Sequence, residues 1–313
     1  MKNALLAGIG TVLLISTLSM PAAQAAESPA YTNAVNNGNT LAAKTRSFKQ
    51  AISSKQITAI HSQYNSFTAS LKSTEASIGK VSGSNTRQAL LKKYVAPAKI
   101  EVERTIYEVS QYRLLSSMEN NVYKEAYTID SDLNKLDRLK KRATQIKEAG
   151  GYPALDPAIG NYLRKKEARA EGEYTITYVD GYKILINNDK NIYYANNMYD
   201  YLSKHIKETE KRIGQVSGSS AREELQKLFV QPGKKEIERT IYYISRHRLM
   251  NSLFNLAQSG KAEEAKSKLP ELDRLKEKAE KIIKDGGYTP LPDEIINNLN
   301  EDEQQLRELI SAG

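Results

Sequence analysis

Apolar residues recur at intervals of three and four along much of the chain, which is the spacing that places them on one face of an α-helix. Two long series share the same internal spacing, and shorter ones occupy residues 136–146 and 272–282. Amphipathic helices bury their apolar faces against each other, so the pattern predicts a mainly α fold made of helical bundles. The long series are Ile57, Ile60, Tyr64, Phe67, Leu71, Thr74 and Ile78, and Ile192, Ala195, Tyr199, Leu202, Ile206, Thr209 and Ile213.

The chain also repeats itself, first at an offset of 135 residues and, after the gain of one residue, at 136. Residues 78–84 return with one change as residues 213–219, and residues 103–107 return unchanged as residues 238–242. Two copies of this length indicate two similar domains. Each copy is predicted to form an elongated three-helix bundle.

Local signals predict where the helices of each copy begin and end. A capping box, in which an N-cap side chain and an acceptor three residues later satisfy backbone N–H groups, is expected to start the second helix. Pro97 and Pro232 predict either a kink in that helix or a break with the proline in the new first turn. A Gly-Gly pair is expected to end the third helix. The capping pairs are Asn85 with Gln88 and Ser220 with Glu223, and the glycine pairs are residues 150–151 and 286–287.

One segment departs from the helical pattern. Residues 173–187 are rich in Tyr, Ile, Thr and Val around Asp180-Gly181, a pair typical of a two-residue β-hairpin turn. The sequence therefore predicts a small β-hairpin insertion between the bundles. An isolated hairpin is marginally stable in water, so it must pack on something. It would serve either as a spacer or as a docking ribbon with exposed tyrosines.

The N-terminal residues are predicted to be a signal peptide. Lys2 supplies a positive start, residues 4–19 are mostly apolar, and Ala23-Gln24-Ala25 fits a cleavage site. The alternative is a membrane anchor, but the apolar run is shorter than the roughly 20 residues that a spanning helix needs. The full organisation is then a signal peptide at residues 1–25, a flexible linker at 26–39, a first bundle at 40–170, a hairpin connector at 171–188 and a second bundle at 189–313.

Composition narrows the possible functions. The 46 Lys and Arg exceed the 37 Asp and Glu, which gives a net charge of +9 and favours acidic partners. The absence of Cys excludes disulfides and thiolate metal sites. No nucleophile elbow, phosphate loop or zinc motif occurs, and His61, His205 and His247 are scattered. We therefore expect no enzyme activity, no cofactor and no metal site.

Arginine and tyrosine lie close together at equivalent places in both copies. Arg104, Tyr107 and Arg113 of the first copy correspond to Arg239, Tyr242 and Arg248 of the second. An arginine beside a tyrosine on one face could bind acidic sugars through charge-assisted hydrogen bonds and ring stacking. The same arginines could equally form ion pairs within the bundle, with Glu103 or Glu238 of a neighbouring helix.

The helices and their spacing resemble the helical N-terminal part of the SbsC-type S-layer proteins of Gram-positive bacilli. The resemblance rests on the proline-led helices at residues 97–101 and 232–236, the tyrosines Tyr107 and Tyr242, and residues 257–265. It implies three-helix bundles that attach non-covalently to an anionic cell-wall polymer. The printed chain contains no run of β-sandwich domains like that of these proteins, so self-assembly into a lattice is not expected of it.

Together these observations predict a secreted, non-enzymatic binding protein located outside the cell or on the cell wall. We expect it to bind an anionic cell-wall polymer, a carbohydrate, through basic and Tyr-rich helical faces. The alternative is an exported structural or regulatory protein that binds another extracellular protein through its helical faces or the hairpin. Neither nucleic acid nor a membrane span in the mature chain is expected.

Overall fold

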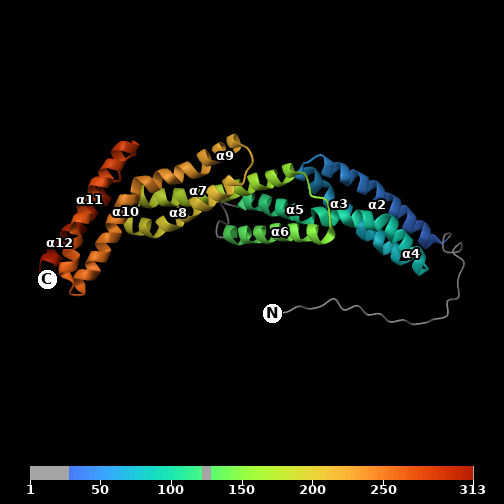
Figure 1. Cartoon of the computed structure of the whole chain (residues 1–313), viewed down its shortest axis with the longest axis horizontal. Coiled ribbons are helices and arrows are strands. Elements are labelled where there is room, and N and C mark those ends of the chain that lie inside the picture. Colours follow the sequence, from blue (N-terminus) through green and yellow to red (C-terminus); the bar gives the residue numbers. More distant parts are fainter. Residues whose placement is uncertain (1–27, 122–127, 313) are drawn as a thin grey trace. The chain divides into compact units, whose positions relative to one another are not determined.

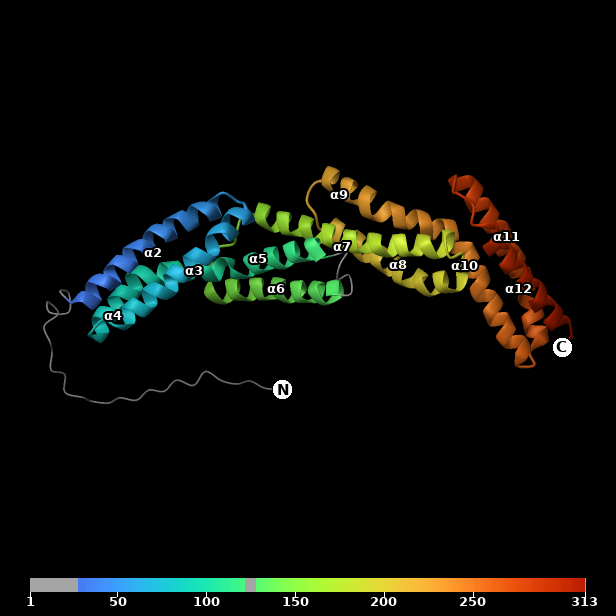
Figure 2. The same cartoon turned by 180° about the vertical axis from the view of Figure 1, so that it is seen from behind.

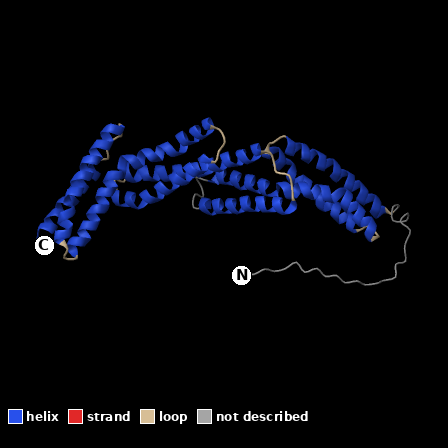
Figure 3. Cartoon of the chain, viewed as in Figure 1, coloured by secondary structure: helices blue, strands red, loops and turns tan. Residues whose placement is uncertain are grey.

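The computed structural model of the chain describes residues 28–121 and 128–312, and the regular structure within these ranges is helical (Figures 1 and 3). The predicted mainly α class is therefore confirmed, whereas the predicted signal peptide lies outside the described residues. The α-helices are α2 (Pro29–Ser53), α3 (Ile57–Gly79), α4 (Ser84–Leu90), α5 (Ala96–Asn121), α6 (Ile129–Gly150), α7 (Pro157–Asn187), α8 (Ile192–Gly214), α9 (Ser219–Leu225), α10 (Gln231–Gln258), α11 (Ala262–Gly286) and α12 (Asp293–Ala312), with π-helical turns η1 (Leu91–Val95) and η3 (Gln226–Val230).

The predicted β-hairpin is wrong, because the described residues contain no strand and residues 173–187 belong to the 31-residue helix α7. Thr175, Val179 and Tyr182 are fully buried, at intervals of four and three that only a helix places on one face. The Tyr182 hydroxyl donates to Oγ1 of Thr240 on α10 at 2.8 Å. Burial of this face outweighs the local turn preference of Asp180-Gly181.

The predicted flexible linker at residues 26–39 is also wrong over its described part, because α2 begins at Pro29. Ser28 starts the helix by accepting a hydrogen bond from the Tyr31 amide at 3.1 Å. Ala34 is fully buried, and Gly38 packs so closely against the Tyr94 ring that a side chain would clash with it. The segment is polar, but its few small residues are enough to pack.

The predicted capping boxes do not form. Gly83 and Gly218 are the N-caps of α4 and α9, with φ of 87° and 95°, and no side chain caps either helix. The turn is held instead by a side chain further along: Nη1 of Arg87 donates to the Val81 carbonyl at 2.9 Å, and Arg222 donates to Val216 at the same distance. Glycine is required here because left-handed backbone is costly for other residues.

The prolines lie in the first turns of α5 and α10, directly after the π-helical turns η1 and η3. The Ala96 amide bonds to the Leu91 carbonyl, and the Gln231 amide bonds to the Gln226 carbonyl, which is the spacing of a π-turn. Of the two predicted alternatives, the structure has the one that places the proline in a new first turn. The π-turn lets the chain continue where an α-helical bond to the proline is missing.

Both long apolar series are confirmed as core. All seven residues of the first are buried on α3, and on α8 only Tyr199 is partly exposed. The predicted glycine pairs also end their helices: Gly151 and Gly287 adopt φ of 60°, and the following tyrosine amides bond back to Lys147 and Ile283 at 3.0 Å.

The contacts divide the chain into two compact units, of which the first contains the described residues 28–50 and 62–102. In this unit the ring of Phe48 on α2 stacks on Phe67 of α3, with centroids 4.4 Å apart. The Tyr94 hydroxyl of η1 donates to Oδ1 of Asn39 at 3.0 Å. The unit is therefore a small bundle of α2, α3 and the helix that follows them.

The second unit contains residues 51–61 and 103–312 and is held together by α7. The first half of α7 buries Ile159 and Leu163 and meets α6 through the ion pair of Lys140 with Glu167. Its second half packs on α8 and α10 in one apolar cluster that continues through α11 and α12 (Figure 2). The predicted boundary at residues 170–171 falls inside α7, which completes the first copy and begins the second.

Replacing Gly172 with alanine is expected to destabilise the protein by about 1–2 kcal/mol. Gly172 is buried on α7, and a Cβ atom there would overlap the base of the Phe229 side chain on η3, which cannot move without shifting its backbone. Gly181→Ala is the matched control on the same helix, because its Cβ would meet only the flexible end of Met198 at 3.0 Å. Urea unfolding of both variants is the measurement, and equal stabilities would contradict the expectation.

Candidate functional site

The arginines predicted from the first copy are placed on α5. Arg104 is partly buried and holds the loop that follows α6: its Nε donates to the Pro153 carbonyl at 2.9 Å and its Nη2 to Ala154 at 3.4 Å. Tyr107 is also partly buried, whereas Arg113 is exposed. Arg104 thus has a structural contact with this loop.

The equivalent Arg239 is inaccessible to a ligand, since it is only 5% exposed on α10. Its Nε lies 3.1 Å from the Glu236 carboxylate, and its Nη2 donates to Oδ1 of Asn187 at 2.9 Å. Asn187 replaces Ile52 of the first copy, which explains why Arg104 and Arg239 have different partners. The predicted companion Tyr242 is partly buried beneath Lys278, whose Nζ lies 5.8 Å from the ring centre.

Arg248 is the predicted arginine that the structure brings next to other polar and aromatic groups on an open surface. Its side chain is 42% exposed on α10 and reaches α8, where it lies 3.1 Å from the Asp200 carboxylate. Its Nε donates to Oδ1 of Asn196, and its guanidinium covers the ring of Tyr199 at 5.4 Å from the centre. The ring beside Arg248 is therefore Tyr199 rather than the predicted Tyr242.

Three tyrosines that were not predicted as site residues project from α8. Tyr193, Tyr194 and Tyr201 are 56%, 57% and 62% exposed, which is unusual for such large aromatic side chains. The first two rings meet edge to face with centroids 5.5 Å apart. Tyr194 and Tyr201 are seven residues apart, which is about two helical turns or 10.5 Å along one side of the helix. We call these three residues, with Asn196 and Arg248, the tyrosine face.

Local sequence positions this face at the start of α8. Lys190 turns the chain with φ of 50°, and Asn191 caps the helix by accepting a hydrogen bond from the Tyr194 amide at 3.0 Å. Ile192 and Ala195 belong to the second long apolar series and are buried, whereas the adjacent Tyr193 and Tyr194 are exposed. Burial of the apolar series therefore determines which side of α8 faces solvent.

The two copies differ at the tyrosine face. Counting back by the repeat offset, the first copy has Thr58, Ala59 and Ser66 where the second has Tyr193, Tyr194 and Tyr201. Because the same helix forms in both copies, the fold does not require aromatic rings at these positions. This comparison of the copies is the sequence signal that could have found the face.

The histidine beside the face is neutral at neutral pH. Burial lowers the pKa of His247 most strongly, Asp302 opposes this effect in part, and Arg248 lowers the pKa further. His247 shares a hydrogen bond with the side-chain amide of Asn251 at 3.1 Å, and its ring lies 6.4 Å from that of Tyr193. The cation of the tyrosine face is therefore Arg248. Rings, an amide and a guanidinium can together bind a sugar ring and an acidic substituent.

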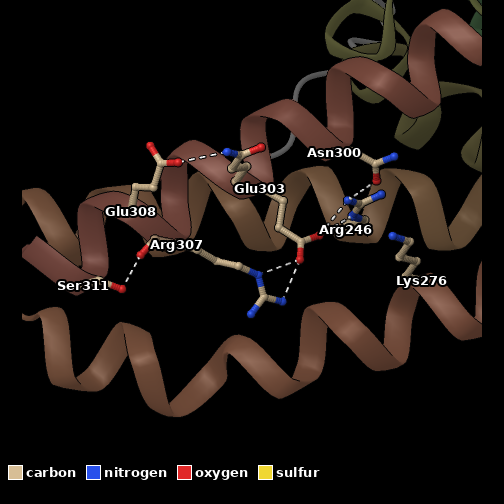
Figure 4. Close-up of a pocket in the computed structure, with 8 residues that line it drawn as sticks. Arg246, Lys276, Asn300, Glu303, Arg307, Glu308 and Ser311 are labelled. Carbon is tan, nitrogen blue, oxygen red and sulfur yellow. Dashed lines mark hydrogen bonds and ion pairs between the residues drawn. The ribbon is translucent and has the colours of Figure 1, made fainter.

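A concave region of about 550 Å³, separate from the tyrosine face, lies between α10, α11 and α12 (Figure 4). Its central Arg246 is 3% exposed and donates to Glu303 Oε2 at 2.6 Å and to Asn300 Oδ1 at 2.9 Å. Arg307 bonds to the other oxygen of Glu303 at 2.6 Å. Burial works to raise the pKa of Glu303, but the hydrogen bonds from Arg307 and Arg246 outweigh it, so the pKa is lowered. These groups satisfy one another and form a structural network.

The described ranges, residues 28–121 and 128–312, contain no group of His, Asp and Glu suited to hold a metal ion. Within the same ranges no helix has both the length and the apolar content needed to cross a membrane.

Comparison with known families gives a match to part of the chain. Residues 15–99 and 180–234 match the family described as the SbsC C-terminal domain. The matched segments end 135 residues apart, which is the repeat offset, so the same part of the unit is matched in both copies. These two segments, which together cover less than half of the chain, are similar to an SbsC-type S-layer protein domain. This agrees with the predicted resemblance, although the matched domain is described as C-terminal and the resemblance was to an N-terminal part. No curated protein and no solved structure matches the chain.

Proposed function

We propose that this SbsC-type region belongs to a non-enzymatic protein of the cell surface that binds an anionic cell-wall polymer through the tyrosine face. The family match indicates a cell-surface structural protein located outside the cell or at the cell wall. The net charge of +9 favours an acidic partner. Binding to an anionic cell-wall polymer is the part that we propose in addition.

The observation that carries the proposal is the difference between the copies at equivalent positions. Exposing three large rings to water has a cost, and the first copy shows that small side chains serve the helix equally well. Tyrosine combines an apolar ring with a polar hydroxyl, which suits the alternating apolar and hydroxylated faces of sugars. A carbohydrate polymer is therefore the partner that best explains Tyr193, Tyr194 and Tyr201.

Arg248 adds the preference for acidic sugars. Its partner Asp200 is 75% exposed, and ion pairs at such exposed positions are weak. A carboxylate or phosphate of the polymer could therefore replace Asp200 while the guanidinium stays over the Tyr199 ring. Because this contact is electrostatic and exposed, binding is expected to weaken as salt is added.

A triple variant that copies the first repeat tests the proposal. Tyr193→Thr, Tyr194→Ala and Tyr201→Ser together are expected to weaken binding to purified cell walls by about tenfold or more, since each stacked ring contributes roughly 0.5–1.5 kcal/mol. The measurement is cosedimentation of the full-length protein with walls at low salt, over a range of wall concentrations. Thermal unfolding should be nearly unchanged, because the replaced rings are exposed.

The arginines provide a second test with a matched control. Arg248→Gln is expected to weaken wall binding and to flatten its salt dependence, whereas Arg113→Gln, the exposed equivalent on α5, is expected to do neither. Wild-type protein that fails to sediment with walls at low salt would overturn the proposal. So would a triple variant that sediments like wild type.

A further inference from the structure

A narrow cleft of about 270 Å³ lies between α5, α6 and α7, away from the tyrosine face. Its walls include Gln111 and Leu115 of α5, Lys140 of α6, and Leu163 and Arg164 of α7. The cleft is large compared with one water molecule, which occupies about 30 Å³ in the liquid. It therefore has room for a small chemical group.

Arg164 enters this cleft without a carboxylate partner. Across the described residues it makes no hydrogen bond and no ion pair, and its Nε is buried and unsatisfied. A guanidinium is always charged in proteins and carries five N–H donors in a fixed plane. A donor of this kind that is taken from water and left unpaired costs stability, so the arrangement favours an added acceptor.

Gln111 is the second polar group of the cleft that has no partner within the described chain. It is only 6% exposed. The little surface that Gln111 retains is consistent with an amide that meets the cleft, whose wall it helps to form. The amide supplies N–H donors beside the guanidinium of Arg164.

The two carboxylates of the cleft are already occupied. Glu108 pairs with Lys147 of α6, and Glu167 pairs with Lys140 at 2.5 Å and with Arg212 of α8. Each therefore has an ammonium or guanidinium of its own, and neither lies within ion-pair distance of Arg164. The cation left over in the cleft is Arg164, which makes an anion the ligand of matching charge.

The second copy has paired polar groups at the same location. At the equivalent positions, Gln111 is replaced by Arg246 and Arg164 by Asn300, so that arginine and amide have exchanged helices. There the two side chains bond to each other at 2.9 Å, and Arg246 also bonds to Glu303 (Figure 4). The polar groups are thus satisfied internally in the second copy and left open in the first.

We propose that this cleft binds one small oxyanion, a carboxylate or a phosphate, through the guanidinium of Arg164 and the amide of Gln111. Planar guanidinium groups bind such anions by two parallel charge-assisted hydrogen bonds, which no neutral ligand reproduces. The apolar walls Leu115 and Leu163 lower the competition from water. The assignment is independent of the tyrosine face, which lies on α8 and α10.

The test uses the full-length protein and two probes, inorganic phosphate and acetate, each compared with chloride at constant ionic strength. Both anions are expected to raise the unfolding temperature by on the order of a few degrees at saturating concentration, because they bind the folded chain alone. They should also shift the Nε–H signal of Arg164 in spectra of arginine-labelled protein, assigned with Arg164→Gln. No response of either measurement would overturn the proposal.

A double variant that copies the paired arrangement of the second copy provides the control. Gln111→Arg with Arg164→Asn should fold, since the second copy is built this way, and should lose the anion-dependent shift in unfolding temperature. Lys165→Gln, an exposed neighbour on α7, should keep it. A double variant that still responds to phosphate as wild type does would contradict the site.

The source of the anion is distinguished by adding fragments of purified wall polymer. If they reproduce the shift of the Arg164 signal, the natural ligand is an acidic group of the polymer; if only the monomeric anions do, it is a free ion. The tyrosine triple variant should respond to phosphate normally in either case. Failure of this site and failure of the tyrosine face are therefore separate results.

Discussion

Replacing Arg212 with glutamine is expected to lower the free energy of unfolding by about 3–5 kcal/mol, since it removes one partner of a buried ion network. Arg212 of α8 bonds to Glu167 and lies 3.2 Å from the carboxylate of Glu171, and both glutamates are only 2% exposed. Burial works to lower the pKa of Arg212, but Glu167, Glu171 and Asp137 outweigh it and raise the pKa.

Without the guanidinium of Arg212, the two buried carboxylates would keep different contacts. Glu167 keeps its contact with Lys140, whereas Glu171 is left with the His205 ring, whose Nδ1 lies 3.6 Å away. The measurement is urea unfolding at neutral pH. Lys211→Gln is the matched control, because this neighbouring side chain is 70% exposed and pairs only with an exposed glutamate. Equal stabilities of the two variants would show that the network contributes no stability.

Replacing Glu303 with glutamine is expected to cost about 3 kcal/mol at neutral pH, because Arg246 would stay buried beside a neutral group. The cost should depend on acidity. The pKa of Glu303 is lowered in the folded chain, so its stabilising contribution is complete above its unfolded value near 4.5 and is lost as the pH falls through the lower folded value. The stability difference between wild type and variant should thus be constant above about pH 5 and shrink in more acidic solution.

Glu308→Gln on the same helix is the control for this second experiment. Glu308 is exposed and makes one hydrogen bond, from Gln304 at 3.0 Å, so its replacement is expected to change stability by less than about 0.5 kcal/mol. A difference between wild type and Glu303→Gln that stays the same down to pH 3 would contradict the role assigned to the Glu303 carboxylate.

The sequence was sufficient to predict the helices and their buried faces, because apolar residues spaced by three and four line up on one face of a helix and on no face of a strand. It failed where a local signal and a tertiary one disagree. Asp180-Gly181 is a turn signal when taken alone, but Val179 and Tyr182 beside it are fully buried on α7. Likewise, the start of α2 is polar and predicts a linker when taken alone. In the structure, Gly38 of this helix packs against Tyr94, a contact between distant parts of the sequence that the local pattern does not reveal.

The candidate site was predicted less well, because residue type alone does not reveal exposure. Arg239 and Arg248 were both predicted as binding residues, yet Arg239 is buried beside Glu236 and Arg248 lies on the surface. Tyr193, Tyr194 and Tyr201 follow no motif and become visible only when the copies are compared residue by residue. The repeat therefore provides the reference against which an added function can be recognised.

The double membership of α7 has a mechanical consequence for a protein of the cell surface. Residues 157–187 form one unbroken helix, which is joined to α6 by the Lys140–Glu167 ion pair in its first half and packs against α8 and α10 with the buried side chains of its second half. No loop or linker separates the copies within this helix. Under tension, the chain between α6 and α8 could lengthen only by pulling buried side chains such as Val179 and Tyr182 out of their contacts, so this junction should resist stretching.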